Sequence, residues 1–209
     1  MPSMIRSFLP LSLSDWPGEL ASVVFTGGCD FRCPWCHNRE LIFPRSDLSE
    51  YGEKELIRVF RKRRHLVRKV VVTGGEPLLW GERLLDFLRA LREEGFGIQL
   101  DTNGNHPDAL RTVLSERLAD RIGMDVKNIP GKYAETVGIP GYHPSNMEHS
   151  LSLVRSSQVA HVFRCTLVPG MVQVQEMLNF AEARKIELRF QEFRPPALSK
   201  EVFPGILQQ

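Results

Sequence analysis

Residues 69–77 read Lys69-Val-Val-Val-Thr-Gly-Gly-Glu-Pro77. A run of β-branched residues is typical of a buried strand, and the two glycines after it let a ligand approach the backbone closely. Pro77 suits the first turn of a helix, and a helical pattern follows at 82–94. This stretch therefore predicts a βα unit whose Gly-Gly-Glu loop lies at the carboxyl end of its strand.

The same strand–loop–helix unit recurs on both sides of this stretch. The other predicted strands are 21–26, 97–101, 121–126, 161–168 and 186–191, and the other predicted helices are 50–64, 107–115, 131–137, 146–156 and 172–185. Strands that alternate with helices predict a parallel sheet with right-handed crossovers. Eight such units close a barrel of typically ~250 residues, so 209 residues have room for about six. We expect an α/β fold, a partial (β/α)6 barrel, as one domain over 1–209 with a lead-in at 1–20 and a proline-rich tail at 194–209.

Three of the four cysteines fall in the loop after the first predicted strand, which reads Gly27-Gly-Cys-Asp-Phe-Arg-Cys-Pro-Trp-Cys-His-Asn38. Thiolates spaced like Cys29, Cys33 and Cys36 can each bond a different iron of a cubane cluster and leave the fourth iron open to a chelating cofactor. The alternative is a zinc knot with His37 as the fourth ligand. Cys36 and His37 are adjacent, however, whereas zinc ligands are usually separated by at least two residues. The spacing therefore favours an open iron–sulfur cluster.

This loop resembles the cysteine loop of the radical S-adenosylmethionine (SAM) superfamily. Asp15-Trp-Pro-Gly18 ahead of it and Cys36-His-Asn-Arg39 at its end are similar to the activating enzymes of glycyl radical proteins, especially the activators of anaerobic ribonucleoside-triphosphate reductase. The similarity runs from about Leu11 to Pro195. It implies that a [4Fe–4S] cluster on the three cysteines cleaves SAM to a 5′-deoxyadenosyl radical, which makes a glycyl radical on a partner enzyme. It also implies a low-potential electron donor such as flavodoxin or ferredoxin.

The polar loops after the other strands should meet the cysteine loop, because the carboxyl ends of parallel strands form one ligand-binding rim. On the residues alone, Glu76 offers a carboxylate to a cation, and Asp101-Thr-Asn-Gly104 is either a capped turn or a ligand contact. Asp125 and Lys127 share a face of their strand, as a structural ion pair or as part of the site. Arg164 could bridge a carboxylate bidentately.

The resemblance assigns these residues to SAM. The predicted cofactor-binding residues are Trp35, Gly74, Gly75, Glu76, Asp101, Asn103, Asp125, Lys127 and Arg164. The Gly-Gly-Glu motif is implied to bind the amino group of SAM, and Lys127 its carboxylate. One departure stands at the end of the sixth strand, where activators of pyruvate formate-lyase carry a histidine against the ribose and this chain has Gln191-Glu-Phe-Arg194. The difference fits the reductase-activating branch and leaves the ribose contact open.

The composition of the chain bears on its partners and on its cellular location. With 27 Lys and Arg against 25 Asp and Glu, the net charge is only +2, so we predict no nucleic-acid partner. No stretch approaches the ~20 apolar residues of a membrane span, and the first ten residues lack the apolar core of a signal peptide. We therefore expect a cytoplasmic protein with reduced thiols. Cys165 is expected to pack as a small apolar residue, and His106, His143, His149 and His161 are expected to be structural or solvent residues.

Three other functions remain open on the sequence. A zinc- or iron-binding structural module without catalysis would be distinguished by its metal content, one zinc against four irons. A radical SAM enzyme that acts on a small molecule, such as a 7-carboxy-7-deazaguanine synthase, is the second, although Cys36-His-Asn38 follows the activator pattern. An activator of another glycyl radical enzyme is the third.

Overall fold

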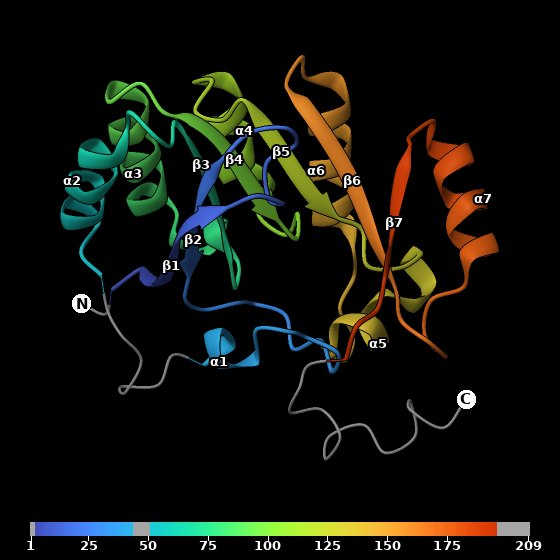
Figure 1. Ribbon diagram of the computed structural model, residues 1–209. Helices are drawn as coiled ribbons and strands as arrows, with labels where there is room; N and C mark the ends of the chain where they lie inside the picture. The colour runs from blue at the N-terminus through green and yellow to red at the C-terminus, as the bar shows by residue number, and fades with distance from the viewer. Residues whose placement is uncertain (1–2, 44–50, 196–209) are drawn as a thin grey trace.

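The computed structural model describes residues 3–43 and 51–195, and a single curved sheet organises them (Figure 1). Its seven strands lie in the order of the sequence, so each parallel strand pairs with the next one along the chain. Strands β2 to β7 are parallel, and β1 pairs with β2 antiparallel. The strands are β1 (Ile5–Ser12), β2 (Ala21–Thr26), β3 (Lys69–Gly74), β4 (Gly97–Thr102), β5 (Arg121–Asp125), β6 (Ala160–Leu167) and β7 (Leu188–Glu192).

The connecting helices lie outside the sheet or beside the carboxyl ends of its strands, as Figure 1 shows. They are α1 (Arg39–Ile42), α2 (Glu53–Arg63), the 3₁₀ helix η1 (Pro77–Trp80), α3 (Glu82–Glu93), α4 (Pro107–Ser115), the 3₁₀ helix η2 (Pro130–Lys132), α5 (Tyr133–Val137), α6 (Ser145–Ser156) and α7 (Val174–Arg184). This arrangement confirms the predicted α/β fold, a partial barrel of six parallel strands with helices outside.

The packing of α3 illustrates how the sequence produces these layers. Leu84, Leu88 and Leu91 recur at helical spacing and are fully buried. They face a sheet whose strand β3 carries Val70 and Val72, which are also buried. Burying apolar side chains of this size contributes about 1.5–3 kcal/mol each to folding, so the match of the two periods fixes the helix on the sheet.

The predicted strands begin and end within two residues of the observed ones. The predicted helix at 131–137 is divided between η2 and α5, and the one at 50–64 begins at Glu53 in the structure, its residue 50 lying outside the described ranges. Most of the predicted tail, 196–209, also lies outside them.

Strand β1 is the one strand that the sequence did not predict, because residues 1–20 were expected to be a lead-in. Its residues do not alternate between apolar and polar, it contains Pro10, and its pairing with β2 has two register shifts. Proline is tolerated on edge strands, and β1 forms an edge of the sheet. Within the described residues, no helix combines the length and the apolar character needed to cross a membrane.

Candidate functional site

A cavity of about 510 Å³ lies at the carboxyl ends of the parallel strands, a volume typical of sites for drug-sized ligands. All of the residues predicted to bind metal or cofactor line it, except Glu76. Those that do are Cys29, Cys33, Trp35, Cys36, Gly74, Gly75, Asp101, Asn103, Asp125, Lys127 and Arg164. The loops that are scattered over the sequence therefore converge on one cavity, as the parallel topology predicts.

The cysteine loop is held in place by backbone hydrogen bonds at its start and in its middle. Gly27 N–H donates to the carbonyl of Met4, 2.9 Å away, and Gly28 N–H donates to the carbonyl of Leu41, 2.7 Å away. Farther along, Arg32 N–H donates to Val137 at 2.8 Å. Because these partners lie before β1, in α1 and in α5, the loop is fixed to three separate segments.

The three thiols of this loop are partly or fully buried, and burial raises the pKa of each. The pKa of Cys29 rises to about 12 and that of Cys33 to about 11, and that of Cys36 is raised as well. Thiolates at these positions therefore need a positive partner, which iron supplies. Among the described residues, no three Cys, His, Asp or Glu side chains are grouped closely enough to hold one metal ion. The three thiols line the cavity together, and thiolates in this position can each bond a different iron of a cubane cluster.

Gly75 packs directly against the cysteine loop. A Cβ at Gly75 would lie 1.9 Å from the carbonyl oxygen of Gly28, which is less than any van der Waals contact allows. Gly74 beside it has a φ of +126°, a conformation that L side chains rarely adopt. The two glycines are therefore required for close packing between the β3 loop and the cysteine loop, in addition to any contact with a ligand.

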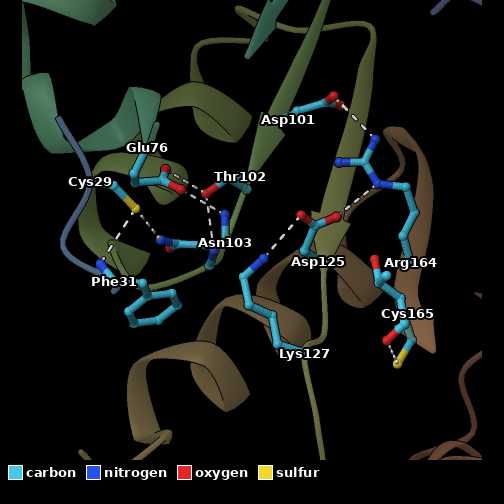
Figure 2. A network of polar contacts seen from close by, with 12 residues as sticks. Cys29, Phe31, Glu76, Asp101, Thr102, Asn103, Asp125, Lys127, Arg164 and Cys165 are labelled. Atoms are coloured by element: carbon cyan, nitrogen blue, oxygen red, sulfur yellow. Dashed lines mark hydrogen bonds and ion pairs between the residues drawn. The ribbon is translucent and has the colours of Figure 1, made fainter. Parts of the chain in front are cut away.

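Glu76 lies behind the residues that line the cavity and does not line it itself. Its side chain is fully buried, and its carboxylate accepts hydrogen bonds from Leu78 N–H (3.1 Å), Thr102 Oγ1 (2.7 Å) and Asn103 N–H (2.7 Å), as Figure 2 shows in part. Burial raises the pKa of Glu76 to about 7, although the hydrogen bonds from Asn103 and Thr102 lower it. The sequence predicted that this carboxylate meets the amino group of SAM, but the structure gives it three partners inside the protein.

Asp125 and Lys127 form the ion pair that their spacing predicts. Lys127 Nζ lies 3.3 Å from Asp125 Oδ2 and 5.1 Å from the centre of the Trp35 ring (Figure 2 shows the ion pair). Burial raises the pKa of Asp125, but the charges of Arg164 and Lys127 outweigh this effect and leave it below its usual value. Lys127 thus places a buried positive charge on the cavity wall, next to the cysteine loop.

Arg164 also engages carboxylates of its own chain. Its Nε donates to Asp125 Oδ1 at 2.9 Å, and its Nη1 donates to Asp101 Oδ2 at 3.1 Å (Figure 2). The sequence predicted that this guanidinium could bridge a carboxylate bidentately. In the structure it joins two different carboxylates, and together with Lys127, which pairs with Asp125, it balances the charge of both.

A polar network beside Cys29 was missed by the sequence interpretation. Asp30 Oδ2 lies 3.2 Å from His106 Nε2, and Asn105 also donates to this carboxylate. Burial raises the pKa of Asp30, but the hydrogen bonds from His106, Asn105 and Asn103 lower it to about 2. No local pattern links Asp30 to His106, so only the tertiary fold reveals the pair.

Some of the other residues that the sequence singled out lie at the cavity, and others lie away from it. Gln191, Glu192 and Arg194, at the end of β7, line the cavity, so the segment that departs from the pyruvate formate-lyase activators does reach it. Trp16, from the Asp-Trp-Pro-Gly motif, packs against Ala21 at the start of β2, at the opposite end of the strand from the cavity. Cys165 is buried in β6 and does not line the cavity, in agreement with a packing role.

Comparisons with known proteins agree with this geometry. The family model described as the radical SAM superfamily matches residues 23–181. A protein of Methanocaldococcus jannaschii that is named provisionally as a glycyl-radical enzyme activating enzyme is 27% identical over 97% of this chain and 85% of its own length. The pyruvate formate-lyase-activating enzyme of Clostridium pasteurianum is 27% identical over 88% of this chain and 80% of its own. A 7-carboxy-7-deazaguanine synthase of Thermococcus kodakarensis is 28% identical over 63% of this chain and 62% of its own length.

Solved structures show the same fold. QueE from Escherichia coli matches with a TM-score of 0.50 at 18% identity, over 90% of this chain and 92% of its own. SuiB of Streptococcus suis, solved bound to S-adenosylmethionine, matches with a TM-score of 0.60 at 17% identity, over 80% of this chain but only 37% of its own length. Since the family model covers most of the sequence, the chain belongs to the radical SAM superfamily, whose members use a [4Fe–4S] cluster and SAM.

Proposed function

We propose that this protein is an activating enzyme that generates a glycyl radical on a partner enzyme. The observation that carries the proposal is the extent of its likeness to the activating enzymes. The Methanocaldococcus jannaschii relative aligns over 97% of this chain, so the likeness includes the strands of the barrel as well as the cysteine loop. The pyruvate formate-lyase-activating enzyme aligns over 88% of it.

In this proposal Cys29, Cys33 and Cys36 ligate the cluster, and the remaining cavity wall binds SAM. The bound cluster and SAM supply a 5′-deoxyadenosyl radical, by one-electron cleavage of SAM, that takes one hydrogen atom from a glycine Cα. Gly74 and Gly75 offer backbone groups at the cavity surface. Lys127 is suited to the carboxylate of SAM because it is a buried cation with Asp125 as its only ion-pair partner among the described residues. Asp101, Arg164 and Asp125, whose charges are balanced with that of Lys127, also line the cavity.

The open sheet supports a protein substrate. Its two edge strands are β1 and β7, which do not pair with one another in the described part of the chain. An incomplete barrel leaves a lateral entrance that a peptide loop could use, whereas a small radical substrate would profit from a closed and dry pocket. The substrate that we propose is therefore the backbone glycine of a partner protein.

We further propose anaerobic ribonucleoside-triphosphate reductase as this partner, on the resemblance carried by Asp15-Trp-Pro-Gly18 and Cys36-His-Asn-Arg39, with a flavodoxin or ferredoxin as electron donor. The test is anaerobic incubation of the reduced protein and SAM with the reductase of the same organism. A doublet electron paramagnetic resonance signal on the reductase, present with Cys165→Ala and absent with Cys36→Ala, is the expected result.

The second candidate, a 7-carboxy-7-deazaguanine synthase, is favoured by the Thermococcus kodakarensis relative, which is as similar per residue as the activating enzymes but covers less of the chain. The same incubation separates the two. If a tetrahydropterin is converted to a deazapurine and no protein radical forms, the activating function is wrong. A radical that forms on pyruvate formate-lyase and not on the reductase would keep the class and change the partner.

A further inference from the structure

Glu76 connects three loops around the cavity, two through its carboxylate and the third through its backbone N–H, although its side chain does not line the cavity. Its Oε1 accepts from the N–H of Leu78, in η1, and from Thr102 Oγ1 at the end of β4. Its Oε2 accepts from the backbone N–H of Asn103. The residue's own N–H donates to the carbonyl of Gly28, 2.8 Å away in the cysteine loop. A side chain that is 0% exposed and has both oxygens occupied fastens the turn after β4 to the β3 loop.

The turn that Glu76 holds presents Asn103 to the cysteine loop. Asn103 Nδ2 donates to Asp30 Oδ1 at 2.9 Å and lies 3.9 Å from the sulfur of Cys29, as Figure 2 shows for the sulfur. Asn103 Oδ1 in turn accepts from Asn105 N–H at 2.8 Å, which fixes the orientation of the amide. The amide N–H groups of Asn103 therefore point at the cysteine loop and are held there from behind by Glu76.

We propose that Glu76 is a positioning residue that acts on the cluster through Asn103, and that it does not contact SAM. This inference rests on the proposed role of Cys29 as a cluster ligand. Hydrogen bonds to cluster sulfurs are one of the factors that set the reduction potential, since they stabilise the more negative, reduced state. Glu76 thereby helps to set the potential at which the cluster accepts an electron, by keeping the Asn103 amide close to the Cys29 sulfur.

The hydrogen bonds around Glu76 identify a substitution that tests this role with little change of shape. Each carboxylate oxygen faces a backbone N–H, from Leu78 on one side and Asn103 on the other. In Glu76→Gln, whichever way the amide is turned, its NH₂ group faces one of these donors, so one of the two hydrogen bonds is lost with almost no change of shape. Asn103→Ala is the complementary variant, because it keeps the backbone N–H that Glu76 accepts and removes only the side-chain donor.

The experiment measures the midpoint potential of the reconstituted cluster without SAM, and then the Kd for SAM. We expect Asn103→Ala to shift the potential to more negative values. Glu76→Gln loses the hold on Asn103, which lowers the potential, and also loses a negative charge near Cys29, which raises it. In the Asn103→Ala background only the charge effect remains, so Glu76→Gln should raise the potential there by more than it does in the wild-type background. Ser22→Ala is the matched control, since it removes a partly buried hydrogen bond to Pro10 near the amino end of β2, away from the cavity, and should leave the potential unchanged.

A shift of the potential by Glu76→Gln that is the same in the wild-type and Asn103→Ala backgrounds, together with a weakened Kd for SAM, would show that the carboxylate contacts the cofactor and does not act through Asn103, and would overturn the inference. If Glu76→Gln does not retain a cluster, Asn103→Ala decides, since a wild-type potential in that variant also overturns it. A different result would contradict the proposed function. In that case the wild-type protein would carry an intact cluster of normal potential and still make no glycyl radical on its partner.

Discussion

Arg164 on β6 donates to Asp101 on β4 although strand β5 lies between them, and the two side chains approach to 3.1 Å over Gly123. Gly123 pairs with Asp101 in the sheet register, and a Cβ there would lie 2.3 Å from Asp101 Oδ1 and 3.0 Å from Arg164 Nη1. The absence of a side chain at Gly123 thus creates the passage through which an arginine links three neighbouring strands.

We therefore expect Gly123→Ala to separate Arg164 from Asp101. Inserting a methyl group into a packed site typically costs about 1–3 kcal/mol, and the displaced half-buried ion pair places the loss at the upper end of that range. Urea denaturation of the two proteins measures the difference. Gly131→Ala is the control, because nothing lies within 4 Å of a Cβ at that position. Equal stability of Gly123→Ala and wild type would show that Arg164 does not need a glycine at position 123 in order to reach Asp101.

The positions of the parallel strands and of most of the rim residues were predictable because their signals are local. Within the predicted strand 69–73 every residue after Lys69 is β-branched, and the observed strand continues it by one residue to Gly74. The spacing of Cys29, Cys33 and Cys36 lies within one loop, and the parallel topology alone places that loop beside Asp125 and Lys127.

The partners of individual side chains were not predictable, because they depend on neighbours that are distant in sequence. Glu76 turns inward since Thr102 and Asn103, on the next strand's loop, offer it donors. Arg164 meets Asp101 only because of the glycine on β5 between them. His106 was taken as a structural or solvent residue, and its approach to Asp30 depends on how α4 is placed against the cysteine loop.

The cysteines differ in the effect that their replacement should have. Cys29→Ala, Cys33→Ala and Cys36→Ala should each abolish SAM cleavage and lower the iron content, because each thiolate is proposed to hold a different iron. Wild type should contain about four irons and four sulfides per chain after anaerobic reconstitution. Iron and sulfide analysis checks both statements, and SAM cleavage at the wild-type rate in any of the three variants would show that the cluster assignment is wrong.

Cys165→Ala is the internal comparison for that series. Cys165 is 1% exposed in β6, so its replacement leaves a small cavity and should cost about 1–2 kcal/mol of unfolding free energy. Iron content and SAM cleavage should stay at the wild-type level. Loss of iron from this variant would identify Cys165 as a ligand.

Gly75→Ala should disturb the cluster although Gly75 is not a proposed ligand. The Cβ of an alanine at position 75 would lie 1.9 Å from the carbonyl oxygen of Gly28. Because this oxygen belongs to the backbone, it cannot move aside as the end of a flexible side chain could. The cysteine loop must then shift away from β3, and we expect lower iron incorporation together with a lower denaturation midpoint. Gly52→Ala is a fair control because its Cβ would meet only ordinary contacts, the nearest at 3.9 Å. Full iron incorporation in Gly75→Ala would count against the close packing of the two loops.

Lys127→Met should weaken SAM binding without loss of the cluster. Lys127 Nζ is a buried cation on the cavity wall, 3.3 Å from Asp125, and methionine keeps most of the side-chain volume against Trp35 while it removes the charge. Asp125 retains its hydrogen bond from Arg164, so the wall does not gain an unpaired carboxylate. A charge-assisted hydrogen bond contributes about 1.5–3 kcal/mol, which corresponds to a rise in Kd of roughly ten- to a hundred-fold.

Titration of the reconstituted protein with SAM measures the change, and Lys132→Met, which removes a lysine paired with Glu176 outside the cavity, serves as the control. If Lys127→Met binds SAM as tightly as wild type, the buried cation does not meet the SAM carboxylate and Lys127 serves only to balance the charge of Asp125.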